Sequence, residues 1–288
     1  MIKFGPAGNP DAFYEAGYRH TWQMMGYLKD MGLQAYEYSC GRGVRLGAET
    51  ASRIREEAQK NGITVSIHAP YFINLANPDS EKFENNIAYF TEVSEAAGVL
   101  GAKRVVFHPG SPMKDERRQA FERCLCNFRR VLDVMDEKGF SDITYCPETM
   151  GKLNQLGDLH EIIELANVDE RVIPTIDFAH LHARGQGALV DEDAFLEIIE
   201  ALENGIGTER TRKIHIHFST IEYTKMGEKR HRTFDEKAYG PRFEDLASVL
   251  IRKRMEPVVI CECAGTMAKD ALEMKTIYES LIEKEVER

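Results

Sequence analysis

Short apolar runs alternate with longer amphipathic helical patterns along the whole chain of 288 residues. The runs have the length and composition of parallel strands that are buried on both faces. Strands are expected at residues 2–5, 34–38, 63–68, 103–108, 142–148, 172–177, 213–218 and 257–262. Helices are expected at residues 10–31, 48–61, 80–101, 114–138, 156–167, 191–204, 242–254 and 268–286. Eight such units without a linker predict an α/β fold, one (β/α)8 TIM barrel that forms a single domain over residues 1–288.

Six of the predicted strands end in a histidine or a carboxylate. These residues are His68, His108, Glu148, Asp177, His217 and Glu262, and His180 follows three positions after Asp177. A barrel brings the carboxyl ends of its strands to one rim, whereas an open sheet spreads them at about 4.8 Å per strand. One histidine at a strand end is usually an ordinary polar residue. Six ligand-type residues in succession instead indicate a metal site of the kind that zinc or manganese prefers.

The candidate ligands are more numerous than one metal ion requires. A four-coordinate zinc ion needs three protein ligands and a water, but this chain offers three carboxylates and at least four histidines. We therefore expect two or three zinc ions, with manganese as a partial alternative. Glu148 and Glu262 are the expected catalytic residues, one of them bridging two ions. Paired metal ions suit the hydrolysis of phosphoesters because they activate water and stabilise both the attacking and the leaving oxygen.

Two histidines of the seventh predicted strand compete for one ligand position. His215 and His217 stand two residues apart and therefore face the same side of the strand. His217 is nearer the carboxyl end and is the expected ligand, with His215 one layer below as a supporting neighbour. The reverse assignment fits the same pattern. Glu37, at the end of the second predicted strand, has no clear partner in the sequence.

A basic run, KMGEKRHR, lies in the long connection after the seventh predicted strand. Such a run is usually a solvated surface, but at the rim of a metal site it is a natural contact for phosphate. It contains the candidate ligand His231, and it also contains Lys229 and Arg230. We expect these two cations, with Arg42 and Arg45 of another rim connection, to bind substrate. Further cations in predicted rim connections are Lys152, Arg184 and Lys269.

The composition limits the class of protein and its partners. A formal net charge of −10 argues against a generally basic nucleic-acid-binding protein, but it leaves room for a local basic groove. The sequence has no apolar run of membrane-spanning length, and its start, MIKFGPAG, lacks the pattern of a secretory signal. The six cysteines form no CxxC pair and are expected to be reduced and packed. We expect a cytoplasmic monomer with no membrane partner.

Several motifs resemble those of endonuclease IV, the metal-dependent apurinic/apyrimidinic endonuclease family within the xylose-isomerase-like barrels. The motifs are HAPYFINLANP at 68–78, FHPGS at 107–111, PETMGKLNQLG at 147–157, DFAH at 177–180 and HFS at 217–219. They follow one another in the family's order. The resemblance implies an enzyme of base excision repair that hydrolyses the phosphodiester bond 5′ to an abasic site in DNA.

The resemblance also implies a ligand set for three zinc ions. The first ion would be held by His68, His108 and Glu148, and the second by Glu148, Asp177, His217 and Glu262. His180 and His231 would belong to the third ion. Tyr71 stands where the family has a tyrosine that contacts DNA.

One position departs from the family's pattern. The family usually has an aspartate two residues before the histidine of the seventh loop, where this chain has Lys229 before His231. A charged lysine cannot bind a metal ion, so the third ion would need another carboxylate. The nearest is Glu228, which can replace the aspartate if the loop is reshaped.

Two other functions are compatible with the same residues. A divalent-metal-dependent sugar isomerase or epimerase would hold one ion with two carboxylates and two histidines, and two further groups would move a proton. A barrel without turnover, which binds abasic DNA or a phosphorylated sugar, is the non-catalytic alternative.

Overall fold

The computed structural model describes residues 1–286 of the chain. Its barrel strands are β1 (Lys3–Pro6), β2 (Ala35–Ser39), β3 (Thr64–His68), β4 (Arg104–Phe107), β5 (Thr144–Pro147), β6 (Thr175–Asp177), β7 (His215–Phe218) and β10 (Val258–Cys261). The remaining strands, β8 (Thr220–Thr224) and β9 (Gly227–Arg232), form a separate hairpin. The longer helices are α3 (Ala48–Asn61), α4 (Ser80–Leu100), α5 (Arg117–Glu137), α6 (Leu159–Ala166), α8 (Glu192–Ile206), α10 (Phe243–Arg252) and α11 (Met267–Val286).

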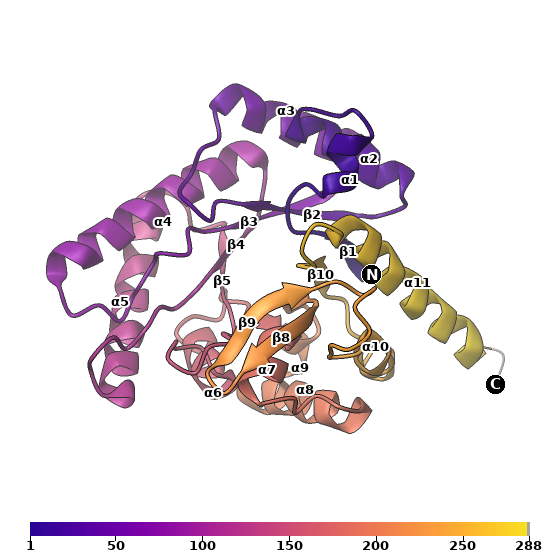
Figure 1. Cartoon of the computed structure of the whole chain (residues 1–288). Helices are drawn as coiled ribbons and strands as arrows, with labels where there is room; N and C mark the ends of the chain where they lie inside the picture. The colour runs from indigo at the N-terminus through magenta and orange to yellow at the C-terminus, as the bar shows by residue number, and fades with distance from the viewer. Residues whose placement is uncertain (287–288) are drawn as a thin grey trace.

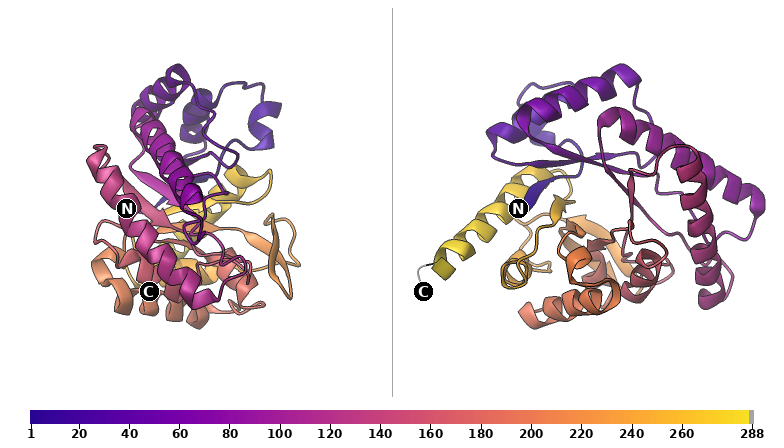
Figure 2. Two further views of the ribbon diagram at one scale, coloured as in Figure 1. Left: turned by 90° about the vertical axis from the view of Figure 1, so that its left-hand side faces the viewer. Right: turned by 180° about the vertical axis from the view of Figure 1, so that it is seen from behind.

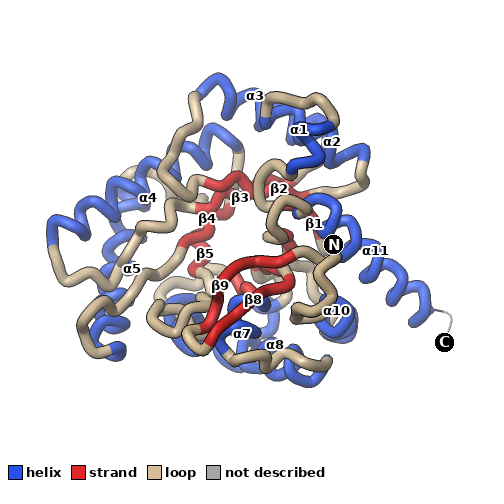
Figure 3. The backbone as a smooth tube through the Cα atoms, in the orientation of Figure 1, coloured by secondary structure: helices blue, strands red, loops and turns tan. Residues whose placement is uncertain are grey.

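The eight barrel strands are all parallel and close into a ring (Figures 1 and 3). Strands β2, β3, β4 and β5 pair in this order, and β1, β10, β7 and β6 make the other half. Two single bridges join the halves, Ala7 with Glu37 and Glu148 with Thr175. The predicted TIM barrel is therefore confirmed, and the ends of its strands meet at one rim.

The main core lies between the strands and the helices that surround them. Figure 2 shows α4 and α5 on the outer side of the strands. Aromatic rings of both layers pack edge to face, such as Phe90 of α4 on Phe107 of β4, with centroids 5.1 Å apart. Both side chains are completely buried. Within residues 1–286, no helix is long and apolar enough to cross a membrane.

The structure differs from the expected elements in two regions. The single helix expected over residues 10–31 is three short pieces, α1 (Asp11–Glu15), the 3-10 helix η1 (Thr21–Gln23) and α2 (Met24–Asp30). Gly17, with a φ of 92°, follows α1 in the left-handed conformation that ends helices. Around β6 and β7, three segments that were expected as loops are regular elements. They are α7 (Phe178–Arg184) after β6, α9 (Thr208–Thr211) before β7, and the hairpin β8–β9 after β7.

Candidate metal centre

The strand ends bring the predicted ligands together in three neighbouring groups. Within each group the possible ligand atoms lie within 4.8 Å of one another. The groups are His68, His108 and Glu148; Glu148, Asp177, His217 and Glu262; and Asp177, His180 and His231. The first two groups share Glu148 and the last two share Asp177, so the centre is continuous across the barrel rim.

Glu148 is the residue that joins the first two groups. It follows β5 directly and is buried, with only 1% of its surface exposed. One carboxylate oxygen, Oε2, lies 3.1 Å from His68 Nε2 and 3.0 Å from His108 Nε2. The other oxygen, Oε1, lies 3.1 Å from His217 Nδ1. Each oxygen therefore faces a different group, which is the arrangement of a bridging carboxylate.

Asp177 has one oxygen that accepts no hydrogen bond from the described residues, and its ion-pair contact is with His180 Nδ1 at 3.4 Å. It ends β6 and caps α7, where its Oδ1 accepts a hydrogen bond from the backbone N–H of His180 at 2.7 Å. Its Oδ2 is buried and has no hydrogen-bond partner among the described residues. A buried carboxylate oxygen that accepts no hydrogen bond is costly unless a cation lies against it. The donor set around it, made of carboxylates and imidazoles, fits zinc or manganese.

Three of the imidazoles are held by a hydrogen bond at Nδ1. His68 Nδ1 lies 2.8 Å from the carbonyl oxygen of Ala69, and His180 Nδ1 lies 2.9 Å from that of Thr149. A carbonyl oxygen only accepts, so each Nδ1 carries a proton, and in the neutral ring each Nε2 is left with a lone pair for a metal ion. His231 Nδ1 lies 2.7 Å from the hydroxyl of Ser219. The rings are thus oriented before any ligand binds.

In the metal-free protein the histidines supply the positive charge that the carboxylates need. Burial opposes protonation of His68, but the contact with Glu148 raises its pKa to about 9. Burial likewise opposes protonation of His180, whose pKa Asp177 and Glu228 raise to about 9. Burial opposes ionisation of Glu148, but His217 and His108 hold its pKa well below the usual range. A metal ion that enters must therefore displace protons.

The hairpin β8–β9 brings Glu228, and not Lys229, to the third group. His231 pairs with Ile221 and Glu228 pairs with Tyr223, so a bulge at Lys229 places Glu228 and His231 on one face. Glu228 Oε2 lies 3.4 Å from His180 Nε2. The bulge thus brings a carboxylate, and not the ammonium group of Lys229, beside His180.

Two glycines permit this approach. A Cβ on Gly227 would lie 2.1 Å from the carbonyl oxygen of Gly151, and a Cβ on Gly151 would lie 2.6 Å from Cβ of Glu228. The backbone N–H of Glu228 donates to the carbonyl oxygen of Gly151 at 3.2 Å. The hairpin tip is thus fixed against the loop that follows β5.

The cations that were predicted to bind substrate do not gather around the centre in the way that the predicted metal ligands do. Lys229 and Arg230 pair with Glu222 on the opposite face of the hairpin. Arg42 and Arg45 are exposed in the connection after β2. Two of the other rim cations have structural partners, because Arg184 donates to three backbone carbonyls after β5 and Lys269 pairs with Asp235.

A cavity of about 330 Å³ opens above the ligands. Its wall includes His68, His108, Glu148, His180, Glu228, His231 and Glu262, together with Tyr71 and Lys152. Tyr71 is 58% exposed at the edge of this cavity. Lys152, which sequence reasoning placed only on the rim, is the one lysine or arginine among the described lining residues.

Sequence reasoning left Glu37 without a role. The structure places Glu37 in the barrel interior, 1% exposed, beside His215 and His217. Alternation along β2 could have shown that it faces inward, but its partners come from β7, far away in the sequence.

A family model, the xylose isomerase-like TIM barrel, matches residues 25–280 of the chain. An uncharacterized protein of Methanocaldococcus jannaschii is 32% identical over 281 residues, which is 98% of each chain. A probable endonuclease 4 of Oceanobacillus iheyensis is 29% identical over 174 residues, 58% of this chain and 56% of that relative. The chain thus matches about half the length of this endonuclease.

Two solved structures have a similar fold. Endonuclease IV of Thermus thermophilus superposes with a TM-score of 0.65 at 18% identity, covering 91% of this chain and 94% of the other. A D-tagatose 3-epimerase-like protein superposes with a TM-score of 0.73 at 19% identity, covering 99% of both chains. At these identities the likeness shows the fold, and the same fold is found under both names.

Proposed function

The chain belongs to the xylose isomerase-like TIM barrel family, and from this premise we propose that it is a metal-dependent endonuclease that cuts DNA at abasic sites. The observation that carries the proposal is the continuity of the three ligand groups through Glu148 and Asp177. A one-metal isomerase has no need of a second and third group. Phosphodiester hydrolysis uses them, because bound ions lower the pKa of water and stabilise both oxygens of the displacement.

The ligands and the catalytic groups would have separate tasks. Glu148, with one oxygen toward each of the first two groups, would hold two zinc ions at a fixed separation. Glu262, which belongs to the second group and also lines the cavity, would orient water and accept its proton. Burial raises the pKa of Glu262 in the metal-free protein, which is the direction expected for a general base.

The cavity would receive an extruded abasic sugar. A nucleotide without a base leaves the helix at low cost, because it has no pairing and no base stacking to break. Tyr71, exposed at the cavity edge, would contact the duplex, and Lys152 would contact a phosphate. Lys229 and Arg230 would contribute at longer range from the outer face of the hairpin.

A direct incision assay tests the proposal. Zinc-loaded protein is incubated with a duplex that carries one abasic-site analogue in a labelled strand. We expect a cut on the 5′ side of the site, with a 3′-hydroxyl on the upstream fragment, and loss of the cut in Glu148→Ala and Glu262→Ala. Glu209→Gln, an exposed glutamate on α9, is the control variant. No incision by protein that holds two or more zinc ions would refute the assignment.

A sugar isomerase or epimerase is the second candidate, and one observation favours it. Among the described residues that line the cavity there is a single lysine and no arginine, few cations for a polyanion. The epimerase would act on a free sugar with one divalent ion. Conversion of a ketose by protein that leaves abasic duplex intact would establish it.

A further inference from the structure

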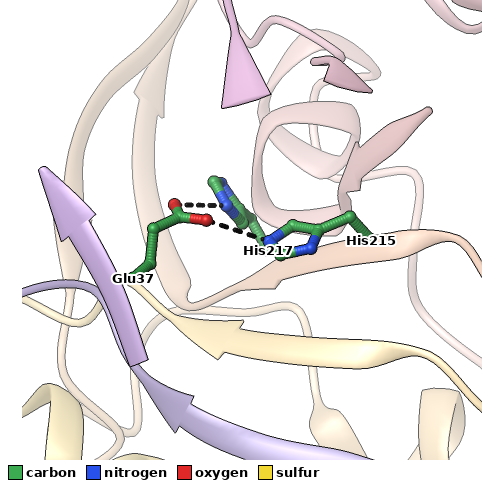
Figure 4. Close-up of side chains that lie close together, drawn as sticks. All are labelled: Glu37, His215 and His217. Carbon is green, nitrogen blue, oxygen red and sulfur yellow. Dashed lines mark hydrogen bonds and ion pairs between the residues drawn. The ribbon is translucent and has the colours of Figure 1, made fainter. Parts of the chain in front are cut away.

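A buried polar cluster lies directly beneath the candidate metal centre, inside the barrel. It consists of Glu37 from β2 and of His215 and His217 from β7 (Figure 4). Glu37 is 1% exposed and both histidines are 0% exposed. The interior of a TIM barrel is normally filled by branched apolar side chains. An ionisable cluster in this position is costly, so it needs a compensating role.

The two carboxylate oxygens of Glu37 contact different side chains. Oε2 accepts a hydrogen bond from the hydroxyl of Ser66 at 2.8 Å and lies 3.0 Å from His215 Nε2. Oε1 lies 2.9 Å from His217 Nε2 as an ion-pair contact, and neither atom has a hydrogen-bond partner among the described residues. Ser66 and His215 thus fix the carboxylate, and its free oxygen is aimed at His217.

The opposite edge of the His217 ring faces the metal ligands. Its Nδ1 lies 3.1 Å from Glu148 Oε1 and 3.4 Å from Glu262 Oε1. A neutral imidazole carries one proton, so when a metal ion takes the lone pair of Nδ1, the proton stands on Nε2 beside Glu37. The lone pair of Nδ1 is then directed at the second ligand group.

Other histidines of the centre are held in the same manner but by weaker acceptors. His68 and His180 use backbone carbonyls, and His231 uses a hydroxyl. His217 is held by a carboxylate. A carboxylate both orients the ring and makes it a stronger donor to a metal ion.

We propose that Glu37 is a positioning residue that fixes the tautomer and the orientation of His217 for metal binding. Glu37 acts through His217 and does not touch the metal ion or the substrate. His215 and Ser66 hold Glu37 in place from its other oxygen. This inference rests on the metal use in the proposed function, but it does not depend on DNA being the substrate.

Metal affinity tests the proposal without any substrate. Glu37→Gln keeps the shape and removes the charge, and Glu37→Leu removes the acceptor but suits a barrel interior. Zinc affinity is measured by competition with a chelator. In both variants we expect one bound ion to weaken by about 10- to 100-fold, with the other ions unchanged. Glu209→Gln, which changes an exposed glutamate of α9 outside the cluster, is the control and should leave the affinity unchanged.

The tautomer itself gives a second readout. Nitrogen-15 NMR of the zinc-loaded protein should show His217 protonated at Nε2 in the native chain and in Glu209→Gln. In Glu37→Leu the Nε2 resonance should shift or begin to exchange. If Glu37 were merely structural, its variants would lower the thermal unfolding midpoint of the metal-free protein but keep the zinc affinity and the tautomer. That result would overturn the proposal. Failure of the incision assay alone would leave it standing, because both readouts here are independent of DNA.

Discussion

Glu148 is the residue on which the metal centre depends most, because each of its oxygens faces a different ligand group. The sequence predicts its place at the end of a strand, and it predicts His68 and His108 on the neighbouring strands. It does not predict which oxygen faces which histidine, because side-chain rotamers depend on the packing of the whole rim. The sequence likewise leaves open whether His215 or His217 faces the centre. The structure places His217 with the ligands and His215 beneath it.

Substitution of Glu148 should affect metal binding and catalysis together. Glu148→Gln keeps the size of the side chain but removes the charge that two groups share. We expect the loss of at least one zinc ion per chain and a fall in incision rate of about 100-fold or more, because each ion supplies several kcal/mol to the transition state. Elemental analysis and the incision assay measure the two effects. Unchanged metal content would contradict the bridging role, and Glu209→Gln is the control.

Metal binding should release protons. The pKa values of His68 and His180 are about 9 in the metal-free protein, against an ordinary value of 6.5. A metal ion binds only the neutral ring, so zinc affinity should rise with pH up to about 9. Titration calorimetry near neutral pH, in buffers of different ionisation enthalpy, measures the protons released. Binding without proton release would show that the rings are already neutral.

The same values make the stability of the metal-free protein depend on pH. Both folded-state pKa values lie above the unfolded value, so their contribution to stability is fully present below pH 6.5. It should be lost as the pH rises through about 9. Urea unfolding of metal-free protein across this range measures the effect. A free energy of unfolding that rises with pH over the same interval would contradict it.

At the level of elements, the hairpin β8–β9 could not be predicted from the sequence pattern. The alternation in residues 213–218 predicts β7, but residues 218–241 contain too many charges to give a strand pattern. The bulge at Lys229 decides which side chain joins His231, and no local signal sets this register. The prediction of one helix over residues 10–31 was wrong, because the apolar spacing continues across Gly17 and gives no sign of the break there.

The bulge can be tested with two adjacent residues. Glu228→Gln removes the carboxylate that faces His180, so we expect weaker binding of one zinc ion by about tenfold or more. Lys229→Ala, the neighbouring residue on the opposite face, should leave metal content unchanged. Chelator competition on both variants decides between them. The reverse order of effects would show that Lys229 and not Glu228 faces the centre.

The start of α6 supports the loop that follows β5. Asp158 accepts from the backbone N–H of Glu161 at 3.0 Å, and Glu161 accepts from that of Asp158 at 3.1 Å, a reciprocal capping box. Asp158→Ala should lower the free energy of unfolding by about 1 kcal/mol. Urea unfolding measures this. Metal content should stay unchanged, and a neutral effect on stability would contradict the role of the cap.

At the level of the whole molecule, the fold could be predicted because eight similar units repeat without interruption. Closure of the ring then brings ligands from strands that are far apart in sequence to one rim. The substrate could not be predicted in the same way. Relatives and neighbours with this barrel are named as endonucleases and as epimerases, and the arrangement of charge around the cavity depends on the pairing of Lys229 and Arg230 with Glu222.

In the function that we propose, more than one metal ion acts together in this centre on a phosphodiester. The direct measurement is a titration of metal-free protein with zinc, with the rate of incision of abasic duplex recorded at each number of ions per chain. We predict no incision with one ion and an onset when the second ion binds. Full incision with one ion per chain, or none at any loading, would contradict the claim.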